Sequence, residues 1–337
     1  MTEELLLSVT IVAACVILTA VLIVLLTPTL SRHFLAIPNE RSSHGKPVPQ
    51  GAGLAMIGAM LAVYVALWVA DHLQADPPWP LPVLGAAVWL TVLGALDDAT
   101  DLPISWRLAG QAAAALLIVF NLPEGFHILP GILPLTVERV LLVIGTMAFI
   151  NAVNFLDGID WITVAQTVPM ATAVIVMAWL DAVPDNVGLM ALVLLGATIG
   201  FAIFNKHPAR IFLGDAGSLP IGLILAWMLI FVARADVEAA LLLPLYTLSD
   251  TGATLVRRAR RGEPLWVAHR SHFYQRAVAL GFKAPDVTLR VFLLGCLLAA
   301  LAVASLLVES LAGDLALLAI GVAATAFLLR HLERGRA

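Results

Sequence analysis

Acidic and amide side chains gather where apolar runs of this 337-residue sequence end. The segment LGALDDATDLP carries Asp97, Asp98 and Asp101. Carboxylates this close together repel one another unless a cation or a basic side chain lies nearby. They would also lie at the C-terminal end of a helix, where the negative end of the helix dipole disfavours acidic side chains. The pattern indicates a functional cluster rather than a solvated helix end.

A second polar segment, FINAVNFLDGIDW, places Asn151, Asn154, Asp157 and Asp160 three residues apart. Residues at this spacing share one face of a helix, so a stripe of amides and carboxylates is expected to emerge from the apolar run. The wrong spacing and the missing terminal glutamate exclude an EF-hand calcium loop.

A third segment, RIFLGDAGSLP, sets Asp215 between Gly214 and Gly217 just before a predicted helix. Small residues with exposed backbone N–H groups suit the close approach of a phosphate. The sequence lacks a Walker-type P-loop, so hydrolysis of a nucleoside triphosphate is not expected.

Basic side chains form two further clusters. His269, Arg270 and His272 of AHRSHFYQ lie beside aromatic residues and suit an anion site, whereas zinc is disfavoured because no cysteine or third histidine accompanies them. His44 and Lys46 of RSSHGKPVPQGAG lie in a basic loop. The run RRARR before the histidines is expected to anchor at lipid head groups.

These clusters together indicate phosphoryl transfer. Carboxylate and amide oxygens are ligands that Mg²⁺ prefers, with Mn²⁺ as the alternative, and a carboxylate can also act as a base. The basic side chains supply partners for phosphate, and catalysis of this kind is mostly positioning and charge neutralisation. Asp250, inside an apolar run, and the pair Arg107 and Gln111, on one helical face, are further candidates.

The composition predicts the scaffold that must hold these residues. Hydrophobic residues make up 61% of the chain and charged residues 12%, with a mean hydropathy of +0.97. These values exclude a soluble enzyme, a disordered chain, a coiled coil and a collagen, and continuous apolar runs disfavour a β-barrel. Cys15 and Cys296 lie in such runs, so no disulfide framework is expected. We predict an all-α polytopic membrane protein with a single domain over residues 1–337.

Apolar runs long enough to cross the bilayer predict about eleven membrane helices. The first is expected to be a helix rather than a cleaved signal peptide, because it is long and follows Glu3 and Glu4. The predicted spans lie near residues 5–30, 51–70, 81–96, 108–122, 139–156, 162–180, 187–204, 219–233, 239–256, 288–308 and 312–330.

Lysine and arginine predict the orientation of these spans. With eleven crossings, only Arg139 and Arg234 of the 19 Lys and Arg residues fall on one side, which leaves 17 on the other. The positive-inside rule makes the rich side cytoplasmic, so the N-terminus is external and the C-terminus cytoplasmic. All the clusters above fall on the cytoplasmic side, and the membrane location implies that one substrate is a lipid.

Five segments, in the order RSSHGKPVPQGAG, LDDATDLP, NAVNFLDGID, FLGDAGS and AHRSH, resemble the motifs of the polyprenyl-phosphate N-acetylhexosamine-1-phosphate transferases, glycosyltransferase family 4. The resemblance covers about residues 39–276. It implies transfer of an N-acetylhexosamine-1-phosphate from a UDP-sugar to undecaprenyl phosphate, with release of UMP. The enzyme would lie in the bacterial inner membrane and begin the synthesis of a lipid-linked glycan.

The resemblance also implies roles at the acidic centre. Asp215 is similar to the family's Mg²⁺ ligand, with Asn154 as a second ligand. Asp97 is similar to the carboxylate proposed to deprotonate the lipid phosphate, and Asp98 to its partner. Arg107 is placed like a basic residue of the lipid-phosphate groove.

On the side of the UDP-sugar, the resemblance implies contacts from seven residues. Asn151, Asp157 and Asp160 would face the nucleotide, with Phe212 under the uracil. His269, Arg270 and His272 would hold the diphosphate or the sugar.

The chain also departs from the family pattern. Asp101 replaces a lysine of the peptidoglycan branch, and HRSHFYQ differs from that branch's run of histidines, so the chain is more similar to the branch that initiates O-antigen or exopolysaccharide units. Trp161 replaces the usual glycine after DGID, and Ala52 replaces a glycine of the first motif.

Several alternatives stay open from the sequence. The sugar could be GlcNAc or a dideoxy derivative such as QuiNAc or FucNAc, and the reaction could take one step or two. A homodimer is among the options for assembly, and no nucleic-acid partner is expected. The competing hypothesis is a secondary transporter, whose acids would lie near the bilayer midplane and whose halves would show a repeat.

Overall fold

The computed structural model describes residues 2–36, 47–70, 80–264, 269–308 and 310–335. Helices account for nearly all the regular structure in this part of the chain, which confirms the all-α prediction. Two short antiparallel strands, β1 (Leu35–Ala36) and β2 (Val48–Pro49), pair with Leu35 opposite Pro49. His44 and Lys46 lie outside the described residues.

Ten of the eleven predicted spans are single helices. Nine helices of the described residues are long and apolar enough to cross a membrane, and α4 (Ile104–Phe120) is a shorter apolar helix. The nine are α1 (Thr2–His33), α2 (Ala52–Val69), α3 (Pro80–Thr100), α5 (Leu135–Phe155), α6 (Ile162–Trp179), α7 (Asp185–Asn205), α8 (Asp215–Ala235), α12 (Ala284–Ser305) and α13 (Leu311–Arg334).

The predicted span at 239–256 is instead divided into two helices. α9 (Val237–Leu242) ends before Pro244, and α10 (Leu245–Arg260) begins after it. Proline cannot donate the backbone hydrogen bond that a continuous helix needs, and its ring crowds the preceding turn. α10 carries several polar side chains and arginines in its last turn, so it is amphipathic rather than apolar. A short helix, α11 (Phe273–Ala279), follows it.

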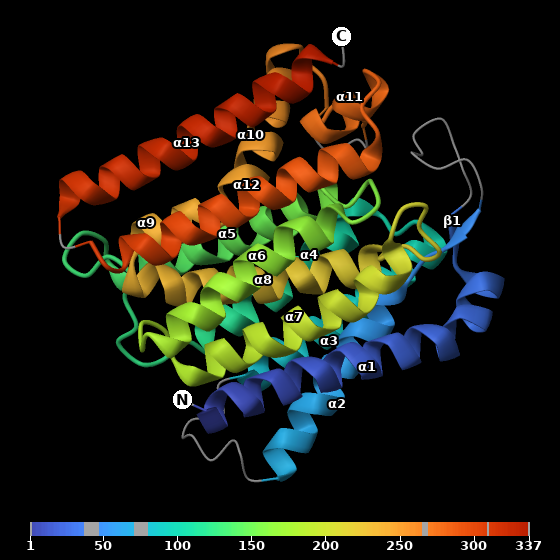
Figure 1. Cartoon of the computed structure of the whole chain (residues 1–337), viewed down its shortest axis with the longest axis horizontal. Helices are drawn as coiled ribbons and strands as arrows, with labels where there is room; N and C mark the ends of the chain where they lie inside the picture. The colour runs from blue at the N-terminus through green and yellow to red at the C-terminus, as the bar shows by residue number, and fades with distance from the viewer. Residues whose placement is uncertain (1, 37–46, 71–79, 265–268, 309, 336–337) are drawn as a thin grey trace.

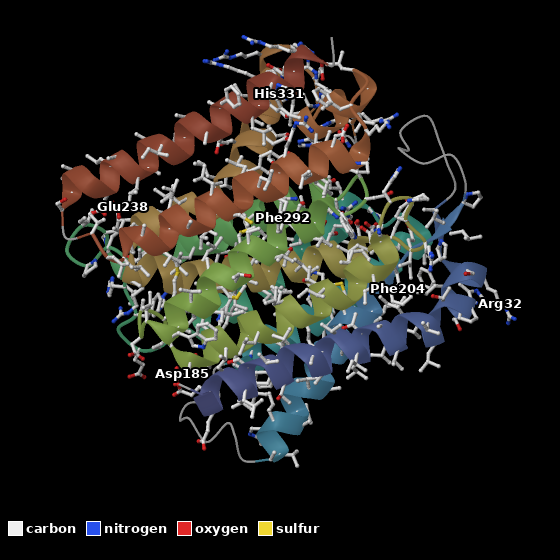
Figure 2. All side chains as sticks on the ribbon, in the orientation of Figure 1. Arg32, Asp185, Phe204, Glu238, Phe292 and His331 are labelled. Atoms are coloured by element: carbon white, nitrogen blue, oxygen red, sulfur yellow. The ribbon has the colours of Figure 1, made fainter. Side chains whose placement is uncertain are left out.

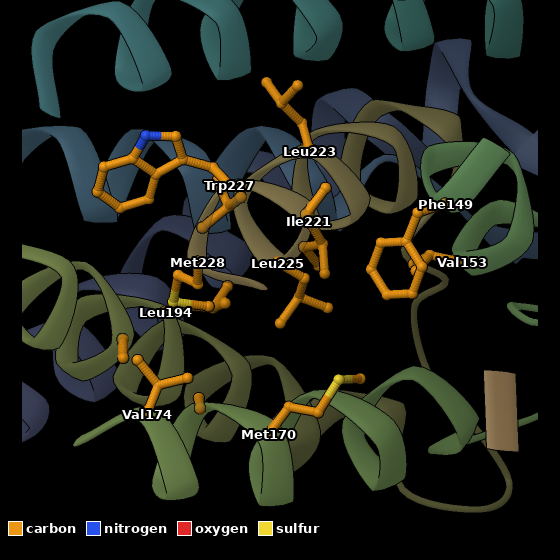
Figure 3. Packing of buried hydrophobic residues seen from close by; sticks show 14 of the residues in the cluster. Phe149, Val153, Met170, Val174, Leu194, Ile221, Leu223, Leu225, Trp227 and Met228 are labelled. Atoms are coloured by element: carbon orange, nitrogen blue, oxygen red, sulfur yellow. The ribbon is translucent and has the colours of Figure 1, made fainter. Parts of the chain in front are cut away.

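α8 forms the centre of the bundle. In its most apolar stretch 89% of the residues are buried, against 22% for α1 and 17% for α13. Figure 1 accordingly shows α13 along one edge and α1 and α2 along the opposite edge. Figure 3 shows the packing around α8. Phe149 and Val153 of α5 lie on the side of Ile221, and Met170, Val174 and Leu194 of α6 and α7 lie on the side of Leu225, whereas Leu223 points the opposite way.

Chain connections alternate between the two ends of the bundle. In Figure 2, Asp185 and Glu238 lie towards one end, and Arg32 and Phe204 lie towards the other. This agrees with the predicted alternation of the loops around these residues. The segments that carry the sequence motifs therefore meet at one end.

Glycines let three helices approach at that end. A Cβ atom at Gly53 of α2 would collide with the backbone of Gly217, and one at Gly94 of α3 would collide with the backbone of Asp215. Small residues of this kind permit close helix contacts in membrane proteins, where lipid removes much of the hydrophobic driving force. The start of α8 is thus enclosed by α2 and α3.

Replacement of Gly94 tests this backbone contact. Gly94→Ala should lower the stability by about 1–3 kcal/mol, because the new methyl group must displace the first turn of α8. The measurement is the thermal unfolding midpoint of the protein in detergent. Gly85→Ala on the same helix is the matched control, since nothing lies within 4 Å of its Cβ position. Equal midpoints for the two variants would contradict the close contact.

Candidate active site

The carboxylate of Asp98 caps the first turn of α8. Its Oδ1 accepts a hydrogen bond from the N–H of Asp215 at 3.1 Å, and its Oδ2 accepts one from Ala216 at 3.2 Å. A negative charge is favourable at the positive end of a helix dipole. Gly214 has φ 72° and lies against this carboxylate, so the turn requires glycine. The sequence suggested that backbone N–H groups beside Asp215 could bind a phosphate. In the structure, two of these N–H groups donate to Asp98 instead.

Arg107 joins two other carboxylates of this centre. Its Nη1 lies 3.0 Å from Asp97 Oδ2, and its Nη2 lies 3.1 Å from Asp215 Oδ2. Asp97 Oδ1 also accepts a hydrogen bond from the N–H of Leu102 at 2.8 Å. The guanidinium is the basic partner that the DDATD cluster requires. Asp101 is exposed, and its backbone N–H donates to the carbonyl of Asp97 at 3.0 Å.

The predicted stripe of α5 separates into two contacts. Asn154 donates from Nδ2 to Asp215 Oδ1 at 2.7 Å and to Ser218 Oγ at 2.9 Å, so it joins the acidic centre. Asn151 donates to Gln111 Oε1 at 2.6 Å and thereby ties α5 to α4. Arg107 and Gln111 share the inward face of α4, as the sequence indicated.

Asp157 and Asp160 lie beyond the end of α5, so the spacing of three does not place them on its face. Asp157 accepts a hydrogen bond from the Thr163 hydroxyl. Burial raises the pKa of Asp157 to about 7, the negative charge of Asp98 adds to this, and the Thr163 hydroxyl opposes it.

Asp160 binds the loop that connects α7 to α8. Its Oδ2 lies 2.6 Å from His207 Nδ1 and accepts a hydrogen bond from the N–H of Ala209 at 3.1 Å. Trp161 adopts φ 64° and donates its indole N–H to the carbonyl of Ala202 at 2.7 Å. Its backbone N–H donates to Asn205 Oδ1 at 2.7 Å. These bonds hold a tryptophan where a glycine would meet less strain.

Phe212 links the first motif, RSSHGKPVPQGAG, to the fourth, FLGDAGS. Its N–H donates to the carbonyl of Pro49 at 2.8 Å, and its carbonyl accepts from the N–H groups of Gly51 and Ala52 at 3.1 Å each. The ring is half-buried at the same end of the bundle. The loop before α8 is thus fixed on one side by Asp160 and on the other by the chain entering α2.

The histidine segment packs on the end of α5. The rings of His269 and His272 stack at 4.9 Å, and the ring of Phe155 lies 5.9 Å from His272. Tyr274 donates its hydroxyl to the carbonyl of Phe155 at 2.9 Å, and it fills the space where Gly158 lacks a Cβ. Gly158 therefore serves a close approach as well as a change of direction.

The electrostatics of this segment differ from those of a simple cationic cluster. Burial, followed by the nearby His272 and Arg258, lowers the pKa of His269 to about 4. His269 is therefore neutral at neutral pH, and the positive charge beside it is that of Arg270, which is exposed.

The structure thus brings Asp97, Asp98, Arg107, Asn154 and Asp215 into direct contact, and it arranges the other described candidates around them. Sequence reasoning missed Ser218 and Asn205 as members of this network. Ser218 lies three residues after Asp215 on α8, so helical spacing could have indicated it. Asn205 is a polar residue that ends an apolar run, which is the signal that had indicated Asn154.

The acidic centre fits a Mg²⁺ ion by its chemistry. The described residues contain no group of three His, Cys, Asp or Glu side chains arranged to hold a metal. Mg²⁺ does not require such a cage, because one or two carboxylates with waters and phosphate oxygens commonly bind it. Asp97 and Asp215 share a cationic partner in Arg107, and Asn154 donates to Asp215 from its amide nitrogen, so its amide oxygen would be the ligand atom.

The fold and the site together define a polytopic membrane protein with an acidic centre suited to phosphoryl transfer. The family model described as glycosyl transferase family 4 matches residues 80–233. This match and the names of the relatives below support the family of polyprenyl-phosphate N-acetylhexosamine-1-phosphate transferases.

Proteins from several bacteria are similar to this chain over most of its length. It is 29% identical over 307 residues to a Bacillus subtilis protein named "Probable undecaprenyl-phosphate N-acetylglucosaminyl 1-phosphate transferase", covering 85% of this chain and 82% of the relative. It is 28% identical to the decaprenyl-phosphate N-acetylglucosaminephosphotransferase of Mycobacterium leprae, covering 77% and 73%. A phospho-N-acetylmuramoyl-pentapeptide-transferase of Lacticaseibacillus paracasei is 29% identical, covering 62% and 68%.

The raised pKa of Asp157 predicts a pH-dependent stability. Its folded-state pKa near 7 lies above the ordinary value near 4, so the linked stabilisation is present at low pH and is lost as the pH rises through 7. Between about pH 6 and pH 8, the unfolding midpoint of the wild type should fall relative to that of Asp157→Asn. Asp185→Asn, at the exposed start of α7 (Figure 2), controls for loss of a charge. Parallel pH curves for wild type and Asp157→Asn would contradict the assignment.

Proposed function

We propose that this protein transfers an N-acetylhexosamine-1-phosphate from a UDP-sugar to undecaprenyl phosphate and releases UMP. The observation that carries the proposal is the contact of Arg107 with both Asp97 and Asp215 at the capped start of α8. This arrangement supplies two carboxylates, an amide and a guanidinium at one point. The names of the relatives supply the reaction class.

In the proposed reaction, an oxygen of the lipid phosphate attacks the β-phosphorus of the UDP-sugar. A new P–O bond forms to the lipid, and the bond from the β-phosphorus to the bridging oxygen breaks. That oxygen leaves with UMP. The bond between the sugar and its phosphate stays intact, so the anomeric configuration is kept.

Three residues of this chain act on the lipid side. Asp97 accepts the proton of the lipid phosphate, and Arg107 beside it binds the resulting anion. Asp98 holds the first turn of α8 in place and so fixes the position of Asp215. Each role follows from a contact described above, together with the family resemblance.

Asp215 and Asn154 would hold Mg²⁺, with Mn²⁺ as an alternative. The ion, when bound, neutralises charge on the diphosphate and stabilises the leaving UMP. Asp215 and Ser218 both accept hydrogen bonds from the amide nitrogen of Asn154 and fix its plane, and its amide oxygen would be the ligand.

The UDP-sugar would lie between the loop before α8 and the histidine segment. We assign Asn151, Asp157, Asp160 and Phe212 to the nucleotide side. Arg270 would meet the diphosphate, and His269 and His272 would contribute polar contacts near it. The relatives' names make UDP-GlcNAc the first sugar substrate to test.

We also propose that this end of the bundle faces the cytoplasm of a bacterial inner membrane. The proposal rests on the sequence prediction that 17 of the 19 Lys and Arg residues lie on the side of the motifs, against Arg139 and Arg234 on the other. UDP-sugars are cytoplasmic metabolites, so this orientation gives the substrate access. The transporter hypothesis gains no support, because the matched relatives carry transferase names.

The central experiment measures UMP release. Purified full-length protein in lipid nanodiscs is incubated with undecaprenyl phosphate, Mg²⁺ and, in separate reactions, UDP-GlcNAc and other UDP-N-acetylsugars. We expect UMP together with a lipid diphosphate-linked sugar, detected by mass spectrometry. No UMP with any of the sugar substrates would refute the proposal.

Replacement of the metal ligand gives a sharper prediction. Asp215→Ala should lower the rate of UMP release by about 100-fold or more, since loss of a central electrostatic group has effects of that size. The residual rate should no longer respond to Mg²⁺, because ligand and metal act together. Asp185→Asn removes a carboxylate at the far end and should behave as wild type. A Mg²⁺ response in Asp215→Ala equal to that of the wild type would show that the metal binds elsewhere.

A further inference from the structure

Asp250 is a buried carboxylate without a role in the proposed reaction. It lies on α10, and no part of its side chain is exposed. A buried charge is costly unless hydrogen bonds and opposite charges compensate it. The hydrogen bonds that compensate Asp250 therefore show what it holds in place.

Five hydrogen-bond donors converge on this one carboxylate. Two are the backbone N–H groups that open α11, and three are side chains. They are Phe273 N–H at 3.1 Å, Tyr274 N–H at 3.3 Å, His272 Nδ1 at 3.0 Å, Tyr246 Oη at 3.3 Å and Thr254 Oγ1 at 3.4 Å. Asp250 thus attaches the whole histidine segment to α10.

The contact with His272 has a chemical consequence beyond attachment. Because an ionised carboxylate only accepts hydrogen bonds, its partner Nδ1 must carry the proton. Nε2 is therefore the ring nitrogen that is left to meet a ligand. Nε2 is buried and has no hydrogen-bond partner among the residues that the structure describes.

An unpartnered polar atom inside a protein costs free energy, so such atoms mark strain or function. His272 is only 2% exposed, and its ring packs against the rings of both His269 and Phe155. Phe155 directly follows Asn154, which contacts Asp215. The His272 ring is therefore attached to the end of α5 that also supplies Asn154 to the acidic centre.

We propose that Asp250 is a positioning residue that acts through His272. It fixes the plane of the imidazole and holds Nδ1, so that Nε2 makes a hydrogen bond with a polar group of the UDP-sugar. The inference rests on the proposed function, since it names a contact to that substrate.

The alternative is that Asp250 only holds α11 in place. The two backbone N–H groups and the hydroxyls of Tyr246 and Thr254 would suffice for that purpose. The two roles differ in what the loss of single hydrogen bonds does. If the role is only structural, the loss of any one hydrogen bond to Asp250 should have a similar effect. If Asp250 positions His272, the loss of the hydrogen bond to His272 should have the largest effect.

The experiment uses four variants of the full-length protein in nanodiscs. Asp250→Asn keeps the shape but replaces the carboxylate with an amide, which weakens the hold on Nδ1 of His272. His272→Asn keeps a donor towards Asp250 but removes the ring nitrogen Nε2. The third variant combines both changes. Tyr246→Phe is the matched control, because it removes one hydrogen bond to Asp250 and leaves His272 untouched.

The readouts are the KM for UDP-GlcNAc, the KM for undecaprenyl phosphate, and direct binding of UDP-GlcNAc by calorimetry. Asp250→Asn and His272→Asn should each raise the KM for UDP-GlcNAc about tenfold or more. The double variant should be no worse than either single variant. The KM of these variants for undecaprenyl phosphate should stay within about twofold of the wild-type value. Both KM values of Tyr246→Phe should also stay within about twofold of the wild type.

Additive effects of the two substitutions would overturn the inference, as would an equal rise of both KM values or a tenfold rise in Tyr246→Phe. His272→Asn keeps the test decisive if Asp250→Asn fails to fold, because its carboxylate stays satisfied. A wild type that binds no UDP-GlcNAc and releases no UMP would instead refute the proposed function. The two failures are thus distinguishable.

Discussion

The hydrogen bonds from the first turn of α8 to Asp98 are the interaction on which the rest of the site depends. They join the end of α3 to the start of α8 in the middle of the bundle. Asp97, one residue earlier, and Asp215, the first residue of α8, consequently meet across Arg107. Because Gly94 and Gly214 permit this contact at the level of the backbone, the geometry of the acidic centre is set before any ligand arrives.

The charges of the centre are not balanced within the protein. Asp97, Asp98 and Asp215 contribute three carboxylates, and Arg107 is the guanidinium that contacts two of them. Helix dipole and backbone N–H groups compensate Asp98. The remaining negative charge suits a divalent cation, whereas the arginine suits a phosphate. Both partners of the proposed reaction thus find complementary charge at one place, in a region where the surrounding helices lower the local dielectric.

Much of this arrangement could be predicted from the sequence. Apolar runs located ten of the helices, and the ordered motifs indicated one shared site. Pro244 was a signal for the break between α9 and α10, but the run of apolar residues around it outweighed that signal. The spacing of Asn151, Asn154, Asp157 and Asp160 was misleading, because α5 ends at Phe155. The partners of Asp98, Asp160 and Asp250 could not be predicted, since each bond joins segments at least 20 residues apart.

The two parts of the site are held in different ways. The acidic centre at the start of α8 is held by close backbone contacts at glycines, so a change there disturbs the packing of the bundle. The other part is attached through hydrogen bonds to one buried carboxylate, and its residues Phe273 and Tyr274 are themselves buried. Two separate sets of contacts, one of backbone packing and one of hydrogen bonds, therefore hold the two halves of the proposed site.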